Sequence, residues 1–338
     1  MTSVPAPGGL AGAPVDPAAL LAQGAGVLSA IGNTPLVDIS LLLDPATTAL
    51  GVRLFAKLES ANPSGSVKDR VALSMITRAR ESGALQPGQM ILEPTSGNTG
   101  ISLAMIGRVL GHPLRAVMPA NVTPERVGLL ELFGAEVVFS PAELGSNGSV
   151  RMAQELAAAD PSLFMPLQYE NPANPDAHYH GTAPEIIEQV GAPIDAFVSG
   201  LGTGGTLMGV GRRLREQFPD VKIVAAEPKP GDSIMGLRSL EDGYVPPVLD
   251  ASKLDRRILV GNAASVAGTR ELTRAGIFAG VSAGAALNVA KRIAKQAEPG
   301  ATIVMLVADS GWKYLSAGIW DERDETQLEA DMEAGHWW

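Results

Sequence analysis

The stretch RLFAKLESANPSGSVKDRVALSMITRARESG, residues 53–83, contains one complete unit of an α/β fold. Its first seven residues form a mostly apolar run of strand length, and residues 69–83 repeat apolar side chains with the period of an amphipathic helix. A polar turn containing Asn62, Pro63 and Gly65 separates the two runs. A lysine, Lys68, follows this turn where the helix is expected to begin. Lys68 is therefore either an ordinary surface charge or a reactive amine.

The same alternation of strand-like and helix-like runs continues along the chain. We expect strands at residues 53–59, 90–96, 114–120, 135–140, 164–169, 196–200, 222–228 and 302–310, and helices at residues 69–83, 101–111, 123–134, 150–160, 183–191, 205–218 and 286–297. Such alternation predicts parallel sheets covered by helices. A chain of 338 residues has room for two such sheets. We therefore predict an α/β fold of two parallel-sheet domains, with the ligand in the cleft between them at the carboxyl ends of the strands.

We expect the chain to divide into two domains, with a further segment at each end. A smaller, mobile domain is expected over residues 62–168, and a larger domain over residues 28–61 and 169–320. Residues 1–27 are rich in Ala, Gly and Pro and predict a flexible arm. Residues 229–255 predict a long surface loop of the kind that often covers a site. The run at residues 311–320 predicts a last helix, and residues 321–338 an acidic tail.

The composition excludes several classes of function. Without cysteine the chain has no disulfide, thiolate metal site or cysteine nucleophile. A net charge of −10 disfavours nucleic acid as a partner. No apolar run approaches the roughly 20 residues that span a bilayer, and the first basic residue is Arg53, so no secretory signal is expected. We predict a cytoplasmic protein without membrane contact.

A glycine-rich turn, SGLGTGGT at residues 199–206, follows one expected strand and opens the next helix. Backbone N–H groups of such a turn can converge on an anion with the help of the helix dipole, and Thr203 and Thr206 add hydroxyl groups. A tight strand-to-helix connection without a ligand explains the same residues. Both interpretations stay open for this turn taken alone.

Two further turns carry polar groups at a helix start. The segment EPTSGNTG, residues 93–100, offers hydroxyl and amide donors that suit a small carboxylate, although the same residue types also cap a helix. Lys68 lies where a helix dipole disfavours a cation, which favours the neutral amine that attacks aldehydes. The competing interpretation of Lys68 is a long side chain that reaches water. Together, a lysine, a carboxylate site and a phosphate site are what pyridoxal phosphate and an amino-acid substrate require.

Six motifs carry a resemblance to a known family. They are IGNTPLV, NPSGSVKDR, EPTSGNTG, QYENPANP, GLGTGGT and GIFAGVSAGAAL. In this order and spacing the chain resembles, from residue 31 to residue 316, the cysteine synthase group of the fold-type II pyridoxal-phosphate enzymes. The resemblance implies a pyridoxal 5′-phosphate-dependent cysteine synthase of two αβα domains, and we expect a homodimer.

Residue roles also follow from the resemblance. Lys68 is implied as the Schiff-base lysine and the proton carrier at Cα. The implied binding residues are Gly202, Thr203, Gly204, Gly205 and Thr206 for the cofactor phosphate, Asn98 for its 3′-oxygen, Ser282 for its pyridine nitrogen, and Thr95, Ser96, Thr99 and Gln168 for the substrate carboxylate. Ser282 could instead cap the helix that follows it.

The implied reaction is β-replacement on an activated L-serine through an aminoacrylate intermediate, which belongs to cysteine biosynthesis. Where acetylserine enzymes carry a Gly-Ile-Gly-Ala-Gly-Phe-type run, this chain reads SIMGLRSLEDGYVPP, residues 233–247. Arg238 in that loop could bind a phosphoryl group through charge-assisted hydrogen bonds. The stretches LRSLEDGYVP, residues 237–246, and ADSGWKYLSAG, residues 308–318, most resemble the O-phosphoserine-dependent M type. Because some acetylserine enzymes also carry an arginine here, an O-acetylserine sulfhydrylase stays the alternative.

The sulfur donor, the C-terminal tail and two histidines each allow more than one interpretation. The donor is sulfide or the thiocarboxylate of a small carrier protein. The tail, ending in Trp337 and Trp338, either closes over the site or only aids solubility. For His178 and His180 we expect a packing or capping role and no metal site. A cystathionine β-synthase, a serine or threonine dehydratase and a non-catalytic binding member of the family are less favoured functions.

Overall fold

The computed structural model describes residues 26–95 and 97–321, whose contacts divide into two compact units. One unit comprises Ile76–Pro166 together with residues 26–29, and the other comprises Ala30–Met75 and residues 167–321. This division assigns Lys68 to the larger unit. The domain boundaries expected above stay a prediction.

The larger unit is built on a six-stranded sheet of order β1-β2-β9-β6-β7-β8. Its strands are β1 (Leu36–Asp38), β2 (Arg53–Leu58), β6 (Ala196–Gly200), β7 (Lys222–Pro228), β8 (Arg256–Val260) and β9 (Thr302–Val307). All neighbours pair in parallel except β1, which runs antiparallel to β2. The carboxyl ends of five strands therefore meet at one edge, the edge at which ligands bind in open α/β sheets.

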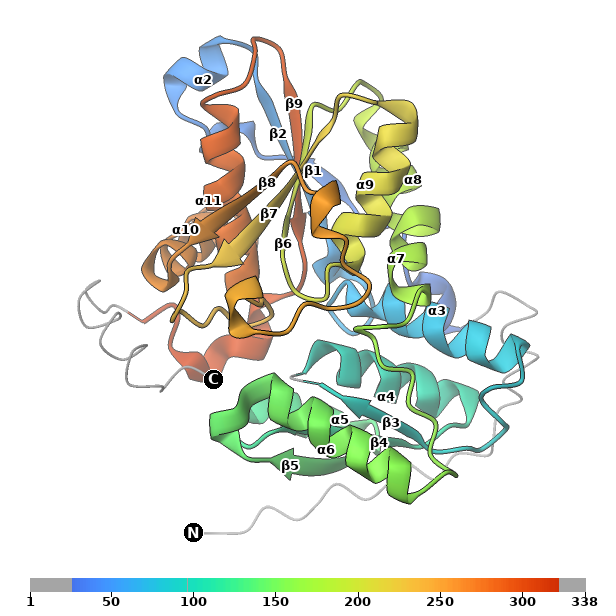
Figure 1. Ribbon diagram of the computed structural model, residues 1–338. Coiled ribbons are helices and arrows are strands. Elements are labelled where there is room, and N and C mark those ends of the chain that lie inside the picture. Colours follow the sequence, from blue (N-terminus) through green and yellow to red (C-terminus); the bar gives the residue numbers. More distant parts are fainter. Residues whose placement is uncertain (1–25, 96, 322–338) are drawn as a thin grey trace. The chain divides into compact units, whose positions relative to one another are not determined.

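Helices cover both faces of this sheet (Figure 1), with α10 and α11 on one side and α7, α8 and α9 on the other. The helices of this unit are α2 (Pro45–Ala49), α7 (Ala173–Ala177), α8 (Ala183–Val190), α9 (Gly205–Gln217), α10 (Asn262–Arg274) and α11 (Val281–Ala294). A π-helical turn, η5 (His178–Thr182), joins α7 to α8. Short 3₁₀ turns are η2 (Ser40–Leu42), η3 (Glu59–Ala61), η6 (Leu240–Asp242), η7 (Ala251–Lys253) and η8 (Gly311–Ala317), while η1 (Val27–Ala30) crosses the division between the units.

The central strand β9 shows why the sheet is buried on both faces. Ile303 and Met305 belong to the apolar core that contains α11, whereas Val304 and Leu306 belong to the core that contains α8 and α9. Successive side chains of a strand point to opposite faces, so an unbroken apolar run fills both cores. This explains why β9 reads as a continuous hydrophobic stretch in the sequence.

The smaller unit contains a three-stranded parallel sheet of order β3-β4-β5. Its strands are β3 (Ile91–Pro94), β4 (Leu114–Pro119) and β5 (Glu136–Ser140), and its helices are α4 (Asn98–Leu110), α5 (Pro124–Leu132) and α6 (Gly145–Ala159), with the 3₁₀ turn η4 (Ala142–Leu144). The helix α3 (Lys68–Glu81) contains the division between the two units, after Met75.

The expected α/β class with parallel sheets is confirmed, while several details differ. The strand expected at residues 164–169 is wrong: Phe164 makes one isolated bridge to Ile91, and the positive φ of Leu167, 48°, turns the chain away. The last helix expected at residues 311–320 is the 3₁₀ turn η8. The sequence pattern did not predict the elements β1, β8 and α10. Within the described ranges, none of the helices is both long and apolar enough to cross a membrane.

Candidate active site

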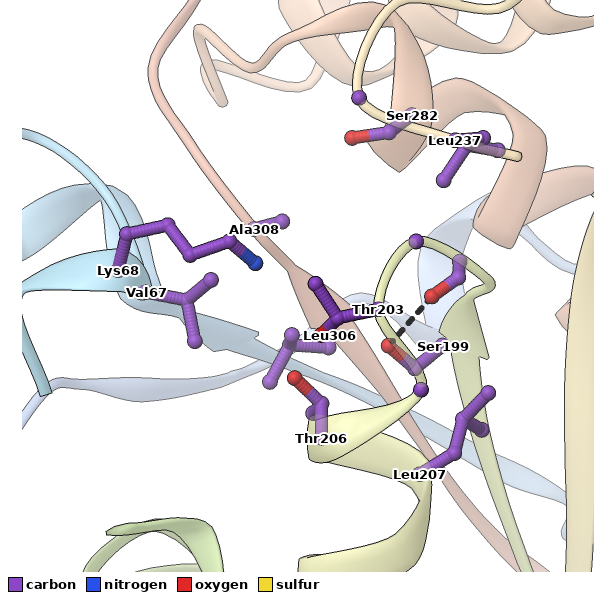
Figure 2. Close-up of a pocket in the computed structure, with 14 residues that line it drawn as sticks. Val67, Lys68, Ser199, Thr203, Thr206, Leu207, Leu237, Ser282, Leu306 and Ala308 are labelled. Carbon is purple, nitrogen blue, oxygen red and sulfur yellow. Dashed lines mark hydrogen bonds between the residues drawn. The ribbon is translucent and has the colours of Figure 1, made fainter. Parts of the chain in front are cut away.

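A pocket lies in the larger unit at the carboxyl edge of its sheet. Its lining comes from the start of α3, the turn between β6 and α9, the first turn of α11, the end of β9 and the loop after β7. In Figure 2, the side chain of Lys68 enters from one side and points toward Thr203 and Thr206, while Ser282 lies at another wall. Residues from positions 68, 203 and 282 of the chain therefore share one cavity.

The fold partly buries the side chain of Lys68. The preceding residue is fixed to the end of β9, because the Val67 backbone N–H donates to the Ala308 carbonyl over 2.8 Å and Ser66 bridges to Asp309. Burial lowers the pKa of the Lys68 amine, and the negative charge of Asp309 offsets only part of that effect. A lysine with a lowered pKa holds more of the neutral, nucleophilic form near neutral pH than a surface lysine does.

The turn from Gly202 to Thr206 forms a close cradle that needs glycine. Gly204 has a φ of +86°, which favours glycine, and it caps α9 (Gly205–Gln217). A Cβ on Gly202 would lie 2.9 Å from the Gly236 carbonyl oxygen, and one on Gly205 would lie 2.0 Å from Asn174 Oδ1. The first N–H groups of α9 lack partners within the helix and can bind an anion. The cradle therefore fits a phosphate group in both shape and polarity.

Asn174 supports the cradle through its side chain. Its Nδ2 donates to Thr203 Oγ1 over 3.0 Å and to the Gln168 carbonyl oxygen over 2.9 Å. The Oδ1 of Asn174 is buried without a hydrogen-bond partner among the residues that the structure describes. Asn174 thereby ties Thr203 to the backbone of Gln168.

His178 contacts the cradle from the π-helical turn, a connection that the sequence did not predict. Its Nε2 lies 3.2 Å from Thr206 Oγ1, and its Nδ1 lies 3.0 Å from Thr182 Oγ1. Burial, together with the positive charges of Lys68 and Arg70, holds the pKa of His178 well below its usual range. The ring is therefore neutral at neutral pH, and one of its nitrogens donates while the other accepts. The one sequence feature that could have indicated this contact is the motif QYENPANP, which His178 follows closely in the chain.

Ser282 lies in the first turn of α11 and lines the pocket. The segment before this helix packs on Asp309: the Gly280 N–H donates to the Asp309 carbonyl over 3.1 Å, and the Tyr314 hydroxyl donates to the Asp309 carboxylate. Asp309 and Tyr314 were not predicted as site residues. They connect the wall that carries Ser282 to the end of β9.

Gln168 and Arg238 belong to the same unit but do not line this cavity. Gln168 is buried, and its backbone carbonyl accepts the hydrogen bond from Asn174. Arg238 is 8% exposed, and its backbone N–H donates to the Leu201 carbonyl oxygen over 2.7 Å. The two residues before it, Gly236 and Leu237, line the pocket. The arginine loop is thus attached directly to the residue that precedes the cradle.

The predicted carboxylate residues other than Gln168 lie in the smaller unit. Thr95 lies in the turn after β3, and its Oγ1 accepts from the backbone N–H groups of Gly97, 3.0 Å, and Gly100, 3.1 Å. Asn98 and Thr99 form the first turn of α4. A Cβ on Gly97, whose φ is +152°, would lie 2.7 Å from Arg126 Cδ. Ser96 lies outside the described residues. This turn is a helix start with several polar groups.

The chain is similar to known proteins over most of its length. A family model described as pyridoxal-phosphate dependent enzyme matches residues 27–309. A probable cysteine synthase of Bacillus subtilis is 43% identical over 301 residues, covering 86% of this chain and 96% of that protein. The cysteine synthase B of Pseudomonas aeruginosa is 42% identical over 298 residues, covering 88% and 98%. The crystal structure of an O-ureido-L-serine synthase matches with a TM-score of 0.81 and 38% identity, covering 90% of this chain and 98% of that one.

The resemblance seen in the sequence motifs is thereby confirmed, and pyridoxal phosphate is the cofactor of the matched family. The side chain of Lys68 and the glycine cradle line one pocket. The chain belongs to the cysteine synthase group of the pyridoxal-phosphate dependent enzymes.

Proposed function

We propose that this enzyme makes L-cysteine by β-replacement, with O-phospho-L-serine as the amino-acid substrate and a sulfur nucleophile as the second substrate. The cysteine synthases among its relatives support the reaction class. The observation that carries the phosphoserine assignment is Arg238, a cation 8% exposed in a loop whose neighbouring residues line the pocket. A guanidinium group binds a phosphoryl group through paired, charge-assisted hydrogen bonds.

In this proposal the cofactor is held by residues of several elements. Lys68 would bind its aldehyde carbon, the cradle from Gly202 to Thr206 would bind its phosphate, and Ser282 would face its pyridine nitrogen. Asn98 would face its 3′-oxygen. When bound, pyridoxal phosphate supplies an electron sink for the electrons left on Cα when a proton departs.

The protein's own groups would then do the remaining work. Thr95, Ser96, Thr99 and Gln168 would hold the substrate carboxylate. The Lys68 amine would take the proton from Cα, which requires the neutral form that burial favours. The hydroxyl of Ser282 is too weak an acid to keep a pyridine nitrogen protonated, which would weaken the electron sink and favour loss of the β-substituent. Arg238 would bind the departing phosphate.

Arg238→Ala tests the leaving group. The change should lower kcat/KM for O-phosphoserine about 10²-fold, the expected loss for charge-assisted hydrogen bonds to an anion, and leave kcat/KM for O-acetylserine within about twofold. Both are measured in the holoenzyme by stopped-flow absorbance of the cofactor, followed by turnover with sulfide. Arg212→Ala is the matched control, because Arg212 also stacks on a tyrosine, 3.9 Å from the Tyr179 ring centroid, but is largely exposed. Faster conversion of O-acetylserine by the wild type, or an unchanged phosphoserine rate in Arg238→Ala, would support an O-acetylserine sulfhydrylase instead.

Gly205→Ala tests the cradle. The added methyl group would lie 2.0 Å from Asn174 Oδ1 and push away the side chain that fixes Thr203. Forced contacts of this kind cost about 1–3 kcal/mol, so we expect pyridoxal phosphate to bind the apoenzyme roughly 5- to 150-fold more weakly. An absorbance titration of the apoenzyme measures this. Gly128→Ala, on α5 where an added Cβ meets nothing within 4 Å, should leave the affinity unchanged. Equal affinities in the wild type and both variants would exclude the turn as the phosphate site.

The proposal allows either sulfide or a carrier-protein thiocarboxylate as the sulfur donor. We expect the enzyme to be a homodimer located in the cytoplasm. The C-terminal tail, including Trp337 and Trp338, lies outside the described residues. A cystathionine β-synthase would use the same chemistry with a thiol nucleophile. Product analysis with sulfide and with homocysteine separates these two functions.

A further inference from the structure

The Arg238 side chain is held between two aromatic rings. Its Cζ lies 5.3 Å from the ring centroid of Tyr169 and 5.0 Å from that of Tyr244. The two rings meet edge to face, with centroids 5.8 Å apart and an angle of 88° between their planes. A guanidinium group within about 6 Å of an aromatic face is attracted to it. Contact with two rings at right angles therefore restricts the position of the Arg238 guanidinium group more than contact with a single ring would.

Backbone hydrogen bonds fix this cluster next to the cradle and next to Gln168. Arg238 is anchored on Leu201, next to the cradle. Tyr169 directly follows Gln168, and its carbonyl oxygen accepts from the Val248 N–H over 3.2 Å, which holds the end of the arginine loop against it. Tyr244 lies on the same loop as Arg238. All three side chains are therefore placed by segments that also carry predicted site residues.

The hydroxyl group of Tyr244 is the unexplained part of this cluster. Its Oη is buried and has no hydrogen-bond partner among the described residues. A buried hydroxyl without a partner costs free energy, and in a native protein it calls for a water, an ion or a ligand. Burial, with the nearby charge of Glu170, raises the pKa of Tyr244, so the group stays protonated and can donate. A donor beside a guanidinium group suits an anionic oxygen.

We propose that Tyr244 is a specificity-determining residue: its ring, together with that of Tyr169, orients Arg238, and its hydroxyl donates a hydrogen bond to the phosphoryl group of the substrate in addition to those from Arg238. This inference rests on the proposed use of O-phosphoserine and adds two residues to that site. A lysine would keep the charge of Arg238 but lose the paired N–H donors with which a guanidinium group binds a phosphoryl group.

Two substitutions at position 244 separate the roles of ring and hydroxyl. Tyr244→Phe keeps the ring and removes the donor, and it should raise KM for O-phosphoserine about tenfold with kcat nearly unchanged. Tyr244→Leu also removes the ring, and it should raise KM roughly a further tenfold. Neither should change KM for O-acetylserine by more than about twofold. Steady-state kinetics of both holoenzymes with sulfide give these values, and cofactor absorbance and thermal midpoint report whether each variant is folded.

Tyr179→Phe is the matched control, because Tyr179 also contacts an arginine and donates from its hydroxyl, to Glu216, away from the pocket. Its KM for O-phosphoserine should equal that of the wild type. Suppose that Arg238→Ala selectively impairs the reaction with O-phosphoserine. If Tyr244→Phe and Tyr244→Leu then behave as the wild type, or if these two variants impair the reactions with both substrates equally, the role of Tyr244 is refuted and the proposed function stands. If Arg238→Ala has no selective effect, the phosphoserine assignment itself fails, and the role of Tyr244 fails with it.

Discussion

Lys68→Ala is expected to lower cysteine-forming turnover by at least about 10²- to 10⁴-fold, the contribution of one positioned acid–base group. Lys68 has two proposed roles, as the amine that binds the cofactor and as the base at Cα, and a methyl group can perform neither. The pocket offers no obvious substitute, because the other groups that line it are apolar, glycine or hydroxyl side chains. Turnover with O-phosphoserine and sulfide, at saturating cofactor, measures the loss.

A second readout distinguishes loss of chemistry from loss of folding. After reduction with borohydride, mass spectrometry should find the cofactor covalently attached to Lys68 in the wild type and unattached in Lys68→Ala. Lys222→Ala, an exposed lysine at the start of β7, should behave as the wild type in both assays. Partial recovery of Lys68→Ala by a small added amine would support the proton-transfer role. Full turnover without the lysine would remove the basis of the proposed mechanism.

Much of the fold could be predicted because hydrophobic periodicity reports burial directly. The run that forms β9 is continuous and apolar, and those that form β2, β6 and β7 are mostly apolar, since both faces of the larger sheet are covered. The strand β8 was missed because its pattern is mostly exposed and begins with two arginines, Arg256 and Arg257, as an edge strand allows. The false strand at residues 164–169 has the right composition, but Pro166 and the positive φ of Leu167 prevent its pairing.

Only those pocket residues that belong to local sequence motifs could be predicted. Lys68, the cradle and Ser282 lie at turns between a strand and a helix, and such turns meet at the carboxyl edge of a parallel sheet. Contacts between distant segments leave no comparable signal. His178 reaches Thr206 across 28 residues, and Arg70 reaches Glu185 across 115. Sequence spacing says nothing about such pairs until the fold is known.

Glu185→Ala is expected to destabilise the protein by about 3–5 kcal/mol, because it breaks a buried network of charges. The carboxylate of Glu185 accepts from Arg70 at 2.7 Å through each of its oxygens and from Lys57 at 2.7 Å, and Arg70 also pairs with Glu59 at 2.7 Å. The side chains of Lys57 and Glu59 are fully buried. Among the described residues, removing Glu185 leaves Lys57 with only neutral hydrogen-bond acceptors, the Thr34 carbonyl and Gln189.

The network also matters for the pocket, because Arg70 follows Lys68 by two residues in the first turn of α3 (Lys68–Glu81). Glu185 on α8 and Glu59 after β2 hold that turn from two directions. A weaker network would let the start of α3 move, and the Lys68 amine with it. We therefore expect Glu185→Ala to lower kcat as well as the free energy of unfolding.

The stability contributed by Glu185 should depend on pH in a defined direction. Burial acts to raise the pKa of Glu185, but the hydrogen bonds and charges of Arg70 and Lys57 outweigh it and lower the pKa to about 2 from an ordinary value of 4.5. Because the pKa of Glu185 is lower in the folded protein than in the unfolded chain, this carboxylate is protonated in the unfolded chain first as pH falls. The contribution is complete above about pH 4.5 to 5 and is lost as pH falls toward 2.

Urea unfolding of the wild type and of Glu185→Gln at several pH values tests this. The difference in unfolding free energy should be largest at about pH 6–7 and should shrink steadily below pH 4.5, because the protonated carboxyl group resembles the amide. Glu188→Ala, on the exposed face of the same helix α8, should change stability by less than about 0.5 kcal/mol. A Glu185 effect as small as that of Glu188, or one that grows as pH falls, would show that the network does not hold the start of α3 by charge.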